Sequence, residues 1–144
     1  MRFVTVVLAL LTLVACRAPV GGAGVPEASQ ILNDTLVLAP GQEAQVGEVF
    51  RVAFLEVSAD SRCPTDVVCV WAGNAAVEIG LRVGMGPTHP FTLNTLVNPT
   101  SVDFAGYRVT LLALSPQPTS TSRIPPDEYR ASLQVTEPDT TAVR

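Results

Sequence analysis

Lysine is absent from the 144-residue chain, and all nine basic residues are arginines. The arginines are scattered along the sequence and form no cluster or stripe. Nucleic-acid binding needs a positive surface, and electrostatic docking on anionic lipid needs a polybasic segment. We therefore expect neither kind of partner, and the formal net charge of −4 favours the same conclusion.

The residues that most often build catalytic and metal sites are also scarce. The single histidine, His89, lies in a Gly/Pro-rich connection (MGPTHP), and one imidazole does not make a convincing zinc or copper site. There is no GxSxG elbow, no phosphate-binding glycine loop and no calcium-loop spacing. The carboxylates are spread singly, apart from Asp127-Glu128, which follows Pro125-Pro126 in a predicted turn. We predict no catalytic residues, no metal and no cofactor.

Charged residues make up only 15% of the chain, whereas hydrophobic residues make up 47%. About 25% charged residues is usual for a soluble domain. Twelve prolines and ten glycines supply many turns. No long stretch has a period of 3.6 residues, so the composition predicts short, buried strands joined by turns.

Alternation of apolar and polar residues is clearest in 75–83 and 128–136, which we predict to be half-buried strands. Turn signals separate them from the shorter or less regular candidates 34–38, 43–47, 49–58, 91–96, 100–104 and 107–114. No helix is available to cross over between parallel strands. The prediction is all-β: an antiparallel β-sandwich, Ig-like or related, of about seven to eight strands, with a small β-barrel as the alternative.

Within 49–58 the apolar side chains do not keep to one face. Phe50, Val52 and Phe54 share one face of a strand, whereas Leu55 and Val57 share the other. Either a bulge switches the face within the strand, or both faces are covered. Residues 107–114 show the same conflict, which favours a central strand.

The N-terminus has the pattern of an export signal. After Met1 and Arg2, an apolar run of about 12 residues is too short for a membrane-spanning helix, which needs about 20. The junction Leu13-Val14-Ala15-Cys16 resembles the lipobox of bacterial lipoproteins. The resemblance implies that Cys16 is acylated and becomes the mature N-terminus, anchored in a membrane by its lipid chains. The alternative is an ordinary signal peptide.

These observations divide the chain into a signal peptide (1–15), a lipidated N-terminus with a flexible tether (16–30), a β-sandwich domain (31–137) and a disordered tail (138–144). The expected location is the cell envelope, on the outer membrane or the outer cell surface. The domain would lie outside the cytoplasm.

Residues 60–74 (DSRCPTDVVCVWAGN) hold the other two cysteines and the only tryptophan. The segment resembles a DSRCP…C…WAG motif of an uncharacterised group of bacterial lipoproteins and secreted domains, for which no activity is established. With Cys16 acylated, Cys63 and Cys69 remain as an even pair, and we expect them to form a disulfide outside the cytoplasm. So small a loop adds about 2 kcal/mol, and the bridge would mainly shape one strand connection.

Two interpretations apply to the side chains of this segment. In the structural one, Asp60 and Ser61 cap a turn, Arg62 pairs with Asp60 or Asp66, and Trp71 packs over the disulfide or closes one end of the sandwich. In the functional one, Asp60, Arg62, Asp66 and Trp71 form a recognition surface on a rigid loop.

For function, the first hypothesis is a non-catalytic binding or envelope-structural module, with an envelope protein or a glycan as its partner. The second is a redox-active lipoprotein that uses Cys63 and Cys69, although their spacing is not CxxC and no helix N-terminus is evident. The third is a protease-inhibitor-like domain that presents either the 60–74 loop or the Pro-rich 115–126 loop.

Overall fold

The computed structural model of the protein describes residues 35–137. These residues form eight strands and one short 3-10 helix. The elements are β1 (Thr35–Leu38), β2 (Glu43–Val46), β3 (Phe50–Asp60), β4 (Ala75–Val83), β5 (His89–Asn94), β6 (Ser101–Phe104), β7 (Tyr107–Ser115), η1 (Pro126–Glu128) and β8 (Arg130–Thr136).

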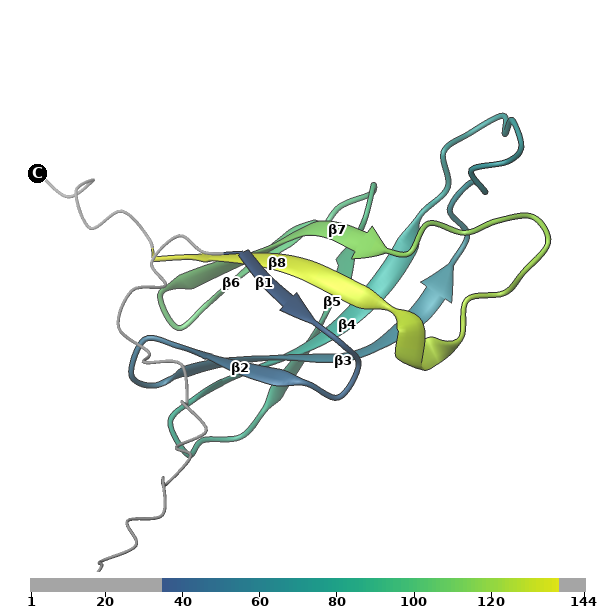
Figure 1. Ribbon diagram of the computed structural model, residues 1–144. Helices are drawn as coiled ribbons and strands as arrows, with labels where there is room; N and C mark the ends of the chain where they lie inside the picture. Colours follow the sequence, from purple (N-terminus) through teal and green to yellow (C-terminus); the bar gives the residue numbers. More distant parts are fainter. Residues whose placement is uncertain (1–34, 138–144) are drawn as a thin grey trace, which may run out of the picture.

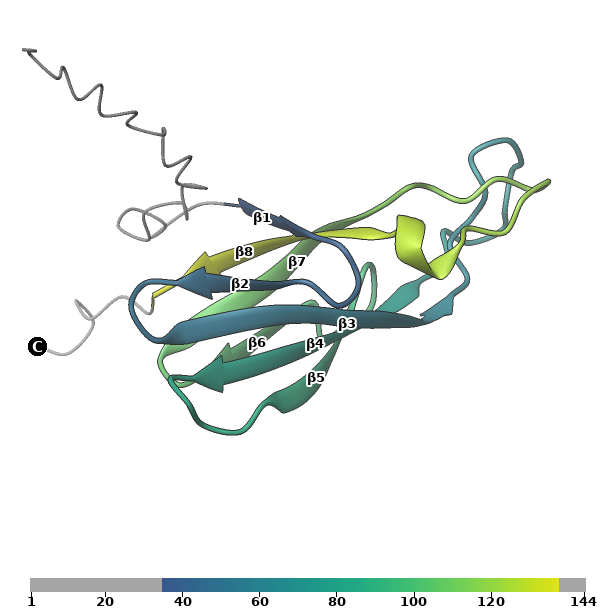
Figure 2. The same ribbon diagram turned by 60° about the horizontal axis from the view of Figure 1, so that its bottom comes forward.

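The strands form two four-stranded sheets that pack face to face (Figure 1, Figure 2). One sheet has the order β1-β8-β7-β6 and the other the order β2-β3-β4-β5. Every strand pairing is antiparallel. The predicted antiparallel sandwich is confirmed, and the barrel alternative is wrong because neither sheet closes onto the other.

The chain passes between the sheets twice, which places distant segments side by side. The first passage follows β1 through a tight turn in which Gly41 has a φ of 79°, a conformation that favours glycine. The second passage follows β5, and the chain then continues through β6, β7 and β8 in the first sheet. As a result β8, the last strand, lies beside β1, the first.

The core lies between the inner faces of the two sheets, because alternate side chains of every long strand point inward. Its fully buried members are Val46, Phe50, Val52, Phe54, Ala75, Val77, Ile79, Leu81, Leu93, Val109, Ala131 and Leu133. At the edge of this core the rings of Phe50 and Tyr107 stack with their centroids 4.2 Å apart. Burial of this apolar surface is the main force that holds the domain together.

A bulge resolves the face conflict in β3. The pairing between β3 and β4 shifts register between Phe54 and Glu56, so Leu55 is the extra residue. Leu55 is exposed, whereas Val57 returns to the inner face and packs against the core. A similar shift in β7 follows Leu111, and β7 lies between β6 and β8 as the predicted central strand.

Every predicted strand agrees with the structure to within two residues, and the shifts of β8 and β5 coincide with identifiable local features. The prolines at 125 and 126 start η1, so β8 begins at Arg130 and not at 128. The strand expected over 91–96 is β5, which begins at His89 and ends at Asn94. Directly after it, the N–H of Thr95 donates to the carbonyl of Ala75, and the hydroxyl of Thr95 accepts a hydrogen bond from the N–H of Ala75.

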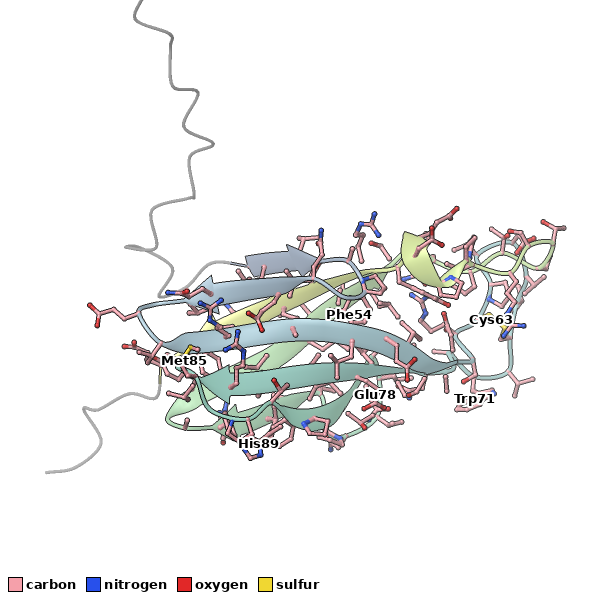
Figure 3. All side chains as sticks on the ribbon, turned by 90° about the horizontal axis from the view of Figure 1, so that it is seen from below. Phe54, Cys63, Trp71, Glu78, Met85 and His89 are labelled. Carbon is pink, nitrogen blue, oxygen red and sulfur yellow. A yellow bond between two sulfur atoms is a disulfide. The ribbon has the colours of Figure 1, made fainter. Side chains whose placement is uncertain are left out.

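The β3–β4 hairpin extends beyond the rest of the sandwich and carries residues 60–74 at its tip, which we call the 60–74 loop. Figure 1 shows it beside the connection between β7 and η1. Trp71 and Cys63 lie at this end of the molecule in Figure 3, and Met85 lies at the other. The segment singled out from the sequence is therefore held at one pole of the domain.

Candidate functional site

The disulfide predicted in the 60–74 loop is present. Cys63 and Cys69 are joined with their Cα atoms 5.9 Å apart. Backbone bonds extend the hairpin below the bridge: the N–H of Ser61 donates to the carbonyl of Asn74, and the N–H of Cys63 donates to the carbonyl of Ala72, each at 2.8 Å. The bridge thus closes the tip of a hairpin whose stem is already paired.

Arg62 is the one charged residue in the part of the chain described here whose side chain is buried. Its Nε and Nη2 donate to the two carboxylate oxygens of Asp60 at 2.9 and 2.7 Å, a bidentate geometry that only arginine provides. The side chains of Arg62 and Asp60 are only 6% and 13% exposed. Of the two partners that the sequence allowed, Asp60 is the one that pairs with Arg62.

The same guanidinium joins the 60–74 loop to the other sheet. Nη1 of Arg62 donates to the carbonyl of Leu114 at 2.5 Å, and Nη2 donates to the carbonyl of Pro116 at 2.9 Å. Both carbonyls lie where β7 ends. The buried guanidinium is thus hydrogen-bonded both to Asp60 in the loop and to the end of β7, and these bonds fix the position of the loop relative to the sandwich.

Tyr129 completes this cluster by donating a hydrogen bond of 3.0 Å from its hydroxyl to Oδ2 of Asp60. Burial works against ionisation of Asp60, but the hydrogen bonds and the charge of Arg62 outweigh it and lower the pKa of the carboxyl. Burial, and then the neighbouring Asp60 carboxylate, raise the pKa of Tyr129. The cluster is therefore an ionised Asp60 held between Arg62 and a neutral Tyr129.

A second contact ties the 60–74 loop to the connection that follows β7. The hydroxyl and the N–H of Ser120 both donate to the carboxylate of Asp66, at 2.5 and 2.8 Å. The N–H of Thr65 donates to the carbonyl of Pro118 at 3.0 Å. The hydroxyl bond from Ser120 is the main reason that the pKa of Asp66 is lowered. Asp66 therefore holds one loop to another.

Gly73 is the residue that lets the two arms of the 60–74 loop approach each other. Its φ is +72°, and a Cβ at this position would lie 1.9 Å from the carbonyl oxygen of Ser61. No side chain fits there without a shift of the backbone. The glycine of the WAG tripeptide is thus required by the close approach of the two arms.

The tip of the loop is apolar and exposed. Val68 and Val70 are fully exposed, Val67 is 44% exposed and Trp71 is 65% exposed. The structural interpretation that Trp71 closes one end of the sandwich is wrong, because most of its side chain is exposed. The buried polar contacts at this end are made by Arg62, which bonds to the carbonyls of Leu114 and Pro116 more than 50 residues later.

A cleft of about 360 Å³ lies at the base of the loop, between the end of β3 and the connection that leads into η1. Its lining includes Asp60 and Tyr129 together with Glu56 and Arg123. Sequence reasoning missed Arg123, Ser120 and the polar role of Tyr129. The alternation in 128–136 indicated that Tyr129 is buried, but nothing in the sequence indicated the partner of its hydroxyl.

The four side chains predicted to form one recognition surface have different roles in the structure. Asp60 and Arg62 are brought together in the buried cluster, whereas Asp66 and Trp71 are both exposed and Asp66 is hydrogen-bonded to Ser120. His89 is not in a loop: it begins β5, with its ring 5.1 Å from that of Phe104. Cys16 and the lipobox lie outside the described residues.

Residues 35–137 show neither a cluster of metal-binding side chains nor a helix that could cross a membrane. No group of three or more His, Cys, Asp or Glu side chains in this range is arranged to hold a metal ion. None of its helices is long and apolar enough to cross a membrane. Comparison of the chain with protein-family models, curated proteins and solved structures finds no match.

Proposed function

We propose that this protein is a membrane-anchored, extracytoplasmic lipoprotein whose sandwich is a non-catalytic binding or envelope-structural module. The signal-like N-terminus and the lipobox resemblance at Cys16 support the anchor. The observation that carries the binding role is the contrast between the base and the tip of the 60–74 loop. The base is held by the Arg62 cluster, whereas the tip presents Val68, Val70 and Trp71 to solvent.

The contrast between a fixed base and an exposed tip favours binding, because it lowers the conformational entropy that the loop loses in a complex. Exposed valine and tryptophan side chains add nothing to the core, yet they occupy the part of the loop that the disulfide, Arg62 and Asp66 hold in place. A preorganised element loses little conformational entropy on binding, and tryptophan is a frequent anchor residue in interfaces. Loops held by a rigid scaffold are where binding sites commonly lie. The partner is an envelope component: a protein, a glycan or a lipid.

Photo-crosslinking in cells tests the binding role. A photoreactive amino acid replaces Val70 at the tip or, as the matched control, Met85, which is equally exposed at the other pole. The proposal expects a reproducible adduct from position 70, identified by mass spectrometry, and none from position 85. Equal labelling from both positions, or none from position 70, would contradict it.

A second candidate function is thiol–disulfide exchange, and it is favoured by the exposure of Cys69. The bridge would accept two electrons from a partner dithiol, which becomes a disulfide in turn. The partner thiolate would attack the exposed Cys69, so a Cys63→Ser variant should trap a mixed disulfide between Cys69 and the partner. If the bridge resists mild reductant and no mixed disulfide forms, its role is structural.

The third candidate function is protease inhibition by the 60–74 or 115–126 loop, and it requires an inhibition screen.

A further inference from the structure

We infer that the tip of the 60–74 loop inserts into the interfacial region of a lipid bilayer. The inference rests on the proposed function in one respect, since it takes this loop as the binding element and names its partner. The observations that carry it are the shape, the chemistry and the support of residues 67–71.

The tip carries almost no polar side-chain groups. Residues 67–71 are Val, Val, Cys, Val and Trp, and Cys69 is oxidised. The indole N–H of Trp71 is the only hydrogen-bonding side-chain group among them apart from the disulfide sulfurs. Of the neighbouring charged groups, Arg62 is buried against Asp60, whereas the carboxylate of Asp66 is exposed and is hydrogen-bonded to Ser120. Insertion that is limited to residues 67–71 desolvates no charged side chain and leaves Asp66 in water.

The shape of the tip favours lipid over a protein partner. A stable protein–protein interface uses about 20–30 residues on each side and about one hydrogen bond per 100–200 Å². The tip is a narrow projection beyond the sheets in Figure 1, and its side chains offer one donor. The hollow in this region lies at the base of the loop, beside Asp60 and Tyr129. A bilayer requires neither shape complementarity nor matched hydrogen bonds.

The side chains of Trp71 and the neighbouring valines suit the interfacial region of a lipid bilayer. Tryptophan is enriched at the membrane–water interface, where its ring is in contact with apolar groups and its N–H with polar ones. The valines beside it supply aliphatic surface for the boundary with the acyl chains. The backbone of an irregular loop has to remain hydrated, which limits insertion to the interfacial zone.

The net charge of the protein predicts which lipid headgroups are sufficient for binding of the tip. The chain is acidic, with a formal net charge of −4 and no lysine, and Arg62 at the base of the loop is already neutralised. Attraction to anionic headgroups therefore contributes nothing. The inference predicts binding to zwitterionic lipid, and no stronger binding when anionic lipid is added.

Trp71 is the only tryptophan in the chain, so its fluorescence reports on the tip alone. The experiment uses residues 17–144, which include both sheets and their shared core but lack the signal segment and Cys16. This material is titrated with vesicles of pure phosphatidylcholine and with vesicles that also contain phosphatidylglycerol. We expect a blue shift and an intensity increase of Trp71 with both, and quenching by lipids brominated near the headgroup end of their chains.

Variants make the test specific to the tip. The double variant Val68→Asp, Val70→Asp keeps the reporter and should reduce the partition coefficient at least tenfold. Met85→Asp, at the opposite pole, should leave the coefficient within twofold of the unmodified protein. Because all three side chains are exposed, thermal unfolding should be the same for every form, which excludes misfolding as the cause of lost binding.

Two outcomes would overturn the inference. One is an emission spectrum that vesicles do not change, and the other is a vesicle-induced shift that the double aspartate variant retains. Because the protein used has no Cys16, neither outcome bears on the lipid anchor. If vesicles have no effect while the position-70 crosslink in cells leads to a protein, the binding role stands and lipid is the wrong partner.

Discussion

The hydroxyl of Tyr129 donates a hydrogen bond of 3.0 Å to Oδ2 of Asp60, which lies 69 residues earlier in the chain. Asp60 ends β3 in one sheet, and Tyr129 immediately precedes β8 in the other. Through Arg62 the same carboxylate is connected to the carbonyls of Leu114 and Pro116. One buried polar cluster therefore links the two sheets at the pole that carries the 60–74 loop.

Replacing Asp60 with asparagine should strongly destabilise the domain. The change leaves the guanidinium of Arg62 buried without its counter-charge, and breaking a buried pair in this way costs about 3–5 kcal/mol. Urea unfolding of residues 17–144 measures this loss. The control is Asp103→Asn, because the Asp103–Arg108 pair has the same bidentate geometry but is 66% and 59% exposed. It should change stability little, and equal effects of the two variants would refute a special role for the cluster.

Acid should weaken the domain partly through the same carboxylate. The pKa of Asp60 is lowered in the folded protein, so its contribution is complete above the unfolded pKa of about 3.9 and is lost as the pH falls through the lower folded value. The difference in unfolding free energy between the unmodified protein and Asp60→Asn should therefore be constant near neutrality and shrink below about pH 4. A difference that stays constant into strong acid would show that ionisation of Asp60 is not what stabilises the cluster.

The Gly73→Ala and Gly84→Ala variants separate backbone strain from steric collision. Both glycines have positive φ, so an alanine at either position costs about 1 kcal/mol or more in strain. A Cβ at Gly84 meets nothing within 4 Å, whereas one at Gly73 would collide with the carbonyl of Ser61. Gly73→Ala should therefore cost at least about 2 kcal/mol more than Gly84→Ala in thermal or urea unfolding. Equal costs would mean that the two arms of the loop are not tightly apposed.

Removing the disulfide should loosen the tip and leave the sandwich folded. A loop with five intervening residues gains about 2 kcal/mol at most from its bridge, and the stem keeps its bonds through Ser61, Asn74, Cys63 and Ala72. A Cys63→Ser, Cys69→Ser variant should show faster hydrogen exchange and proteolysis within residues 64–71, with little change in the protection of β4 and β7. Global unfolding of this variant would show that the bridge is essential to the fold.

The sandwich could be predicted well because the pattern of apolar and polar residues within each strand shows which side chains face the core. Alternation in residues 75–83 and 128–136 reports directly which side chains face the core. The conflicting faces around Leu55 allowed either a bulge or two covered faces, and the structure has the bulge. The disulfide followed from the small number of cysteines, together with the expectation that Cys16 is acylated. None of these conclusions required knowledge of which distant segments meet.

The candidate site was predicted less completely because it depends on contacts between segments that are distant in the sequence. Arg62 could be expected to pair with an aspartate, but its contacts with Leu114 and Pro116 depend on how the two sheets are placed. Ser120 gave no signal in the sequence because serine is common in loops. For Trp71 the sequence allowed packing over the disulfide, closure of one end of the sandwich, or a place on a recognition surface, and the structure leaves its side chain 65% exposed.

The central claim, a lipid-anchored extracytoplasmic module with a structural bridge, is tested most directly by the intact mass of the protein isolated from native membranes. The mass is measured with and without reduction before thiol alkylation. The account predicts residues 16–144 plus acyl groups on Cys16, and two alkylated thiols that appear only after reduction. A chain without lipid, or one whose Cys63 and Cys69 react without reduction, would contradict it.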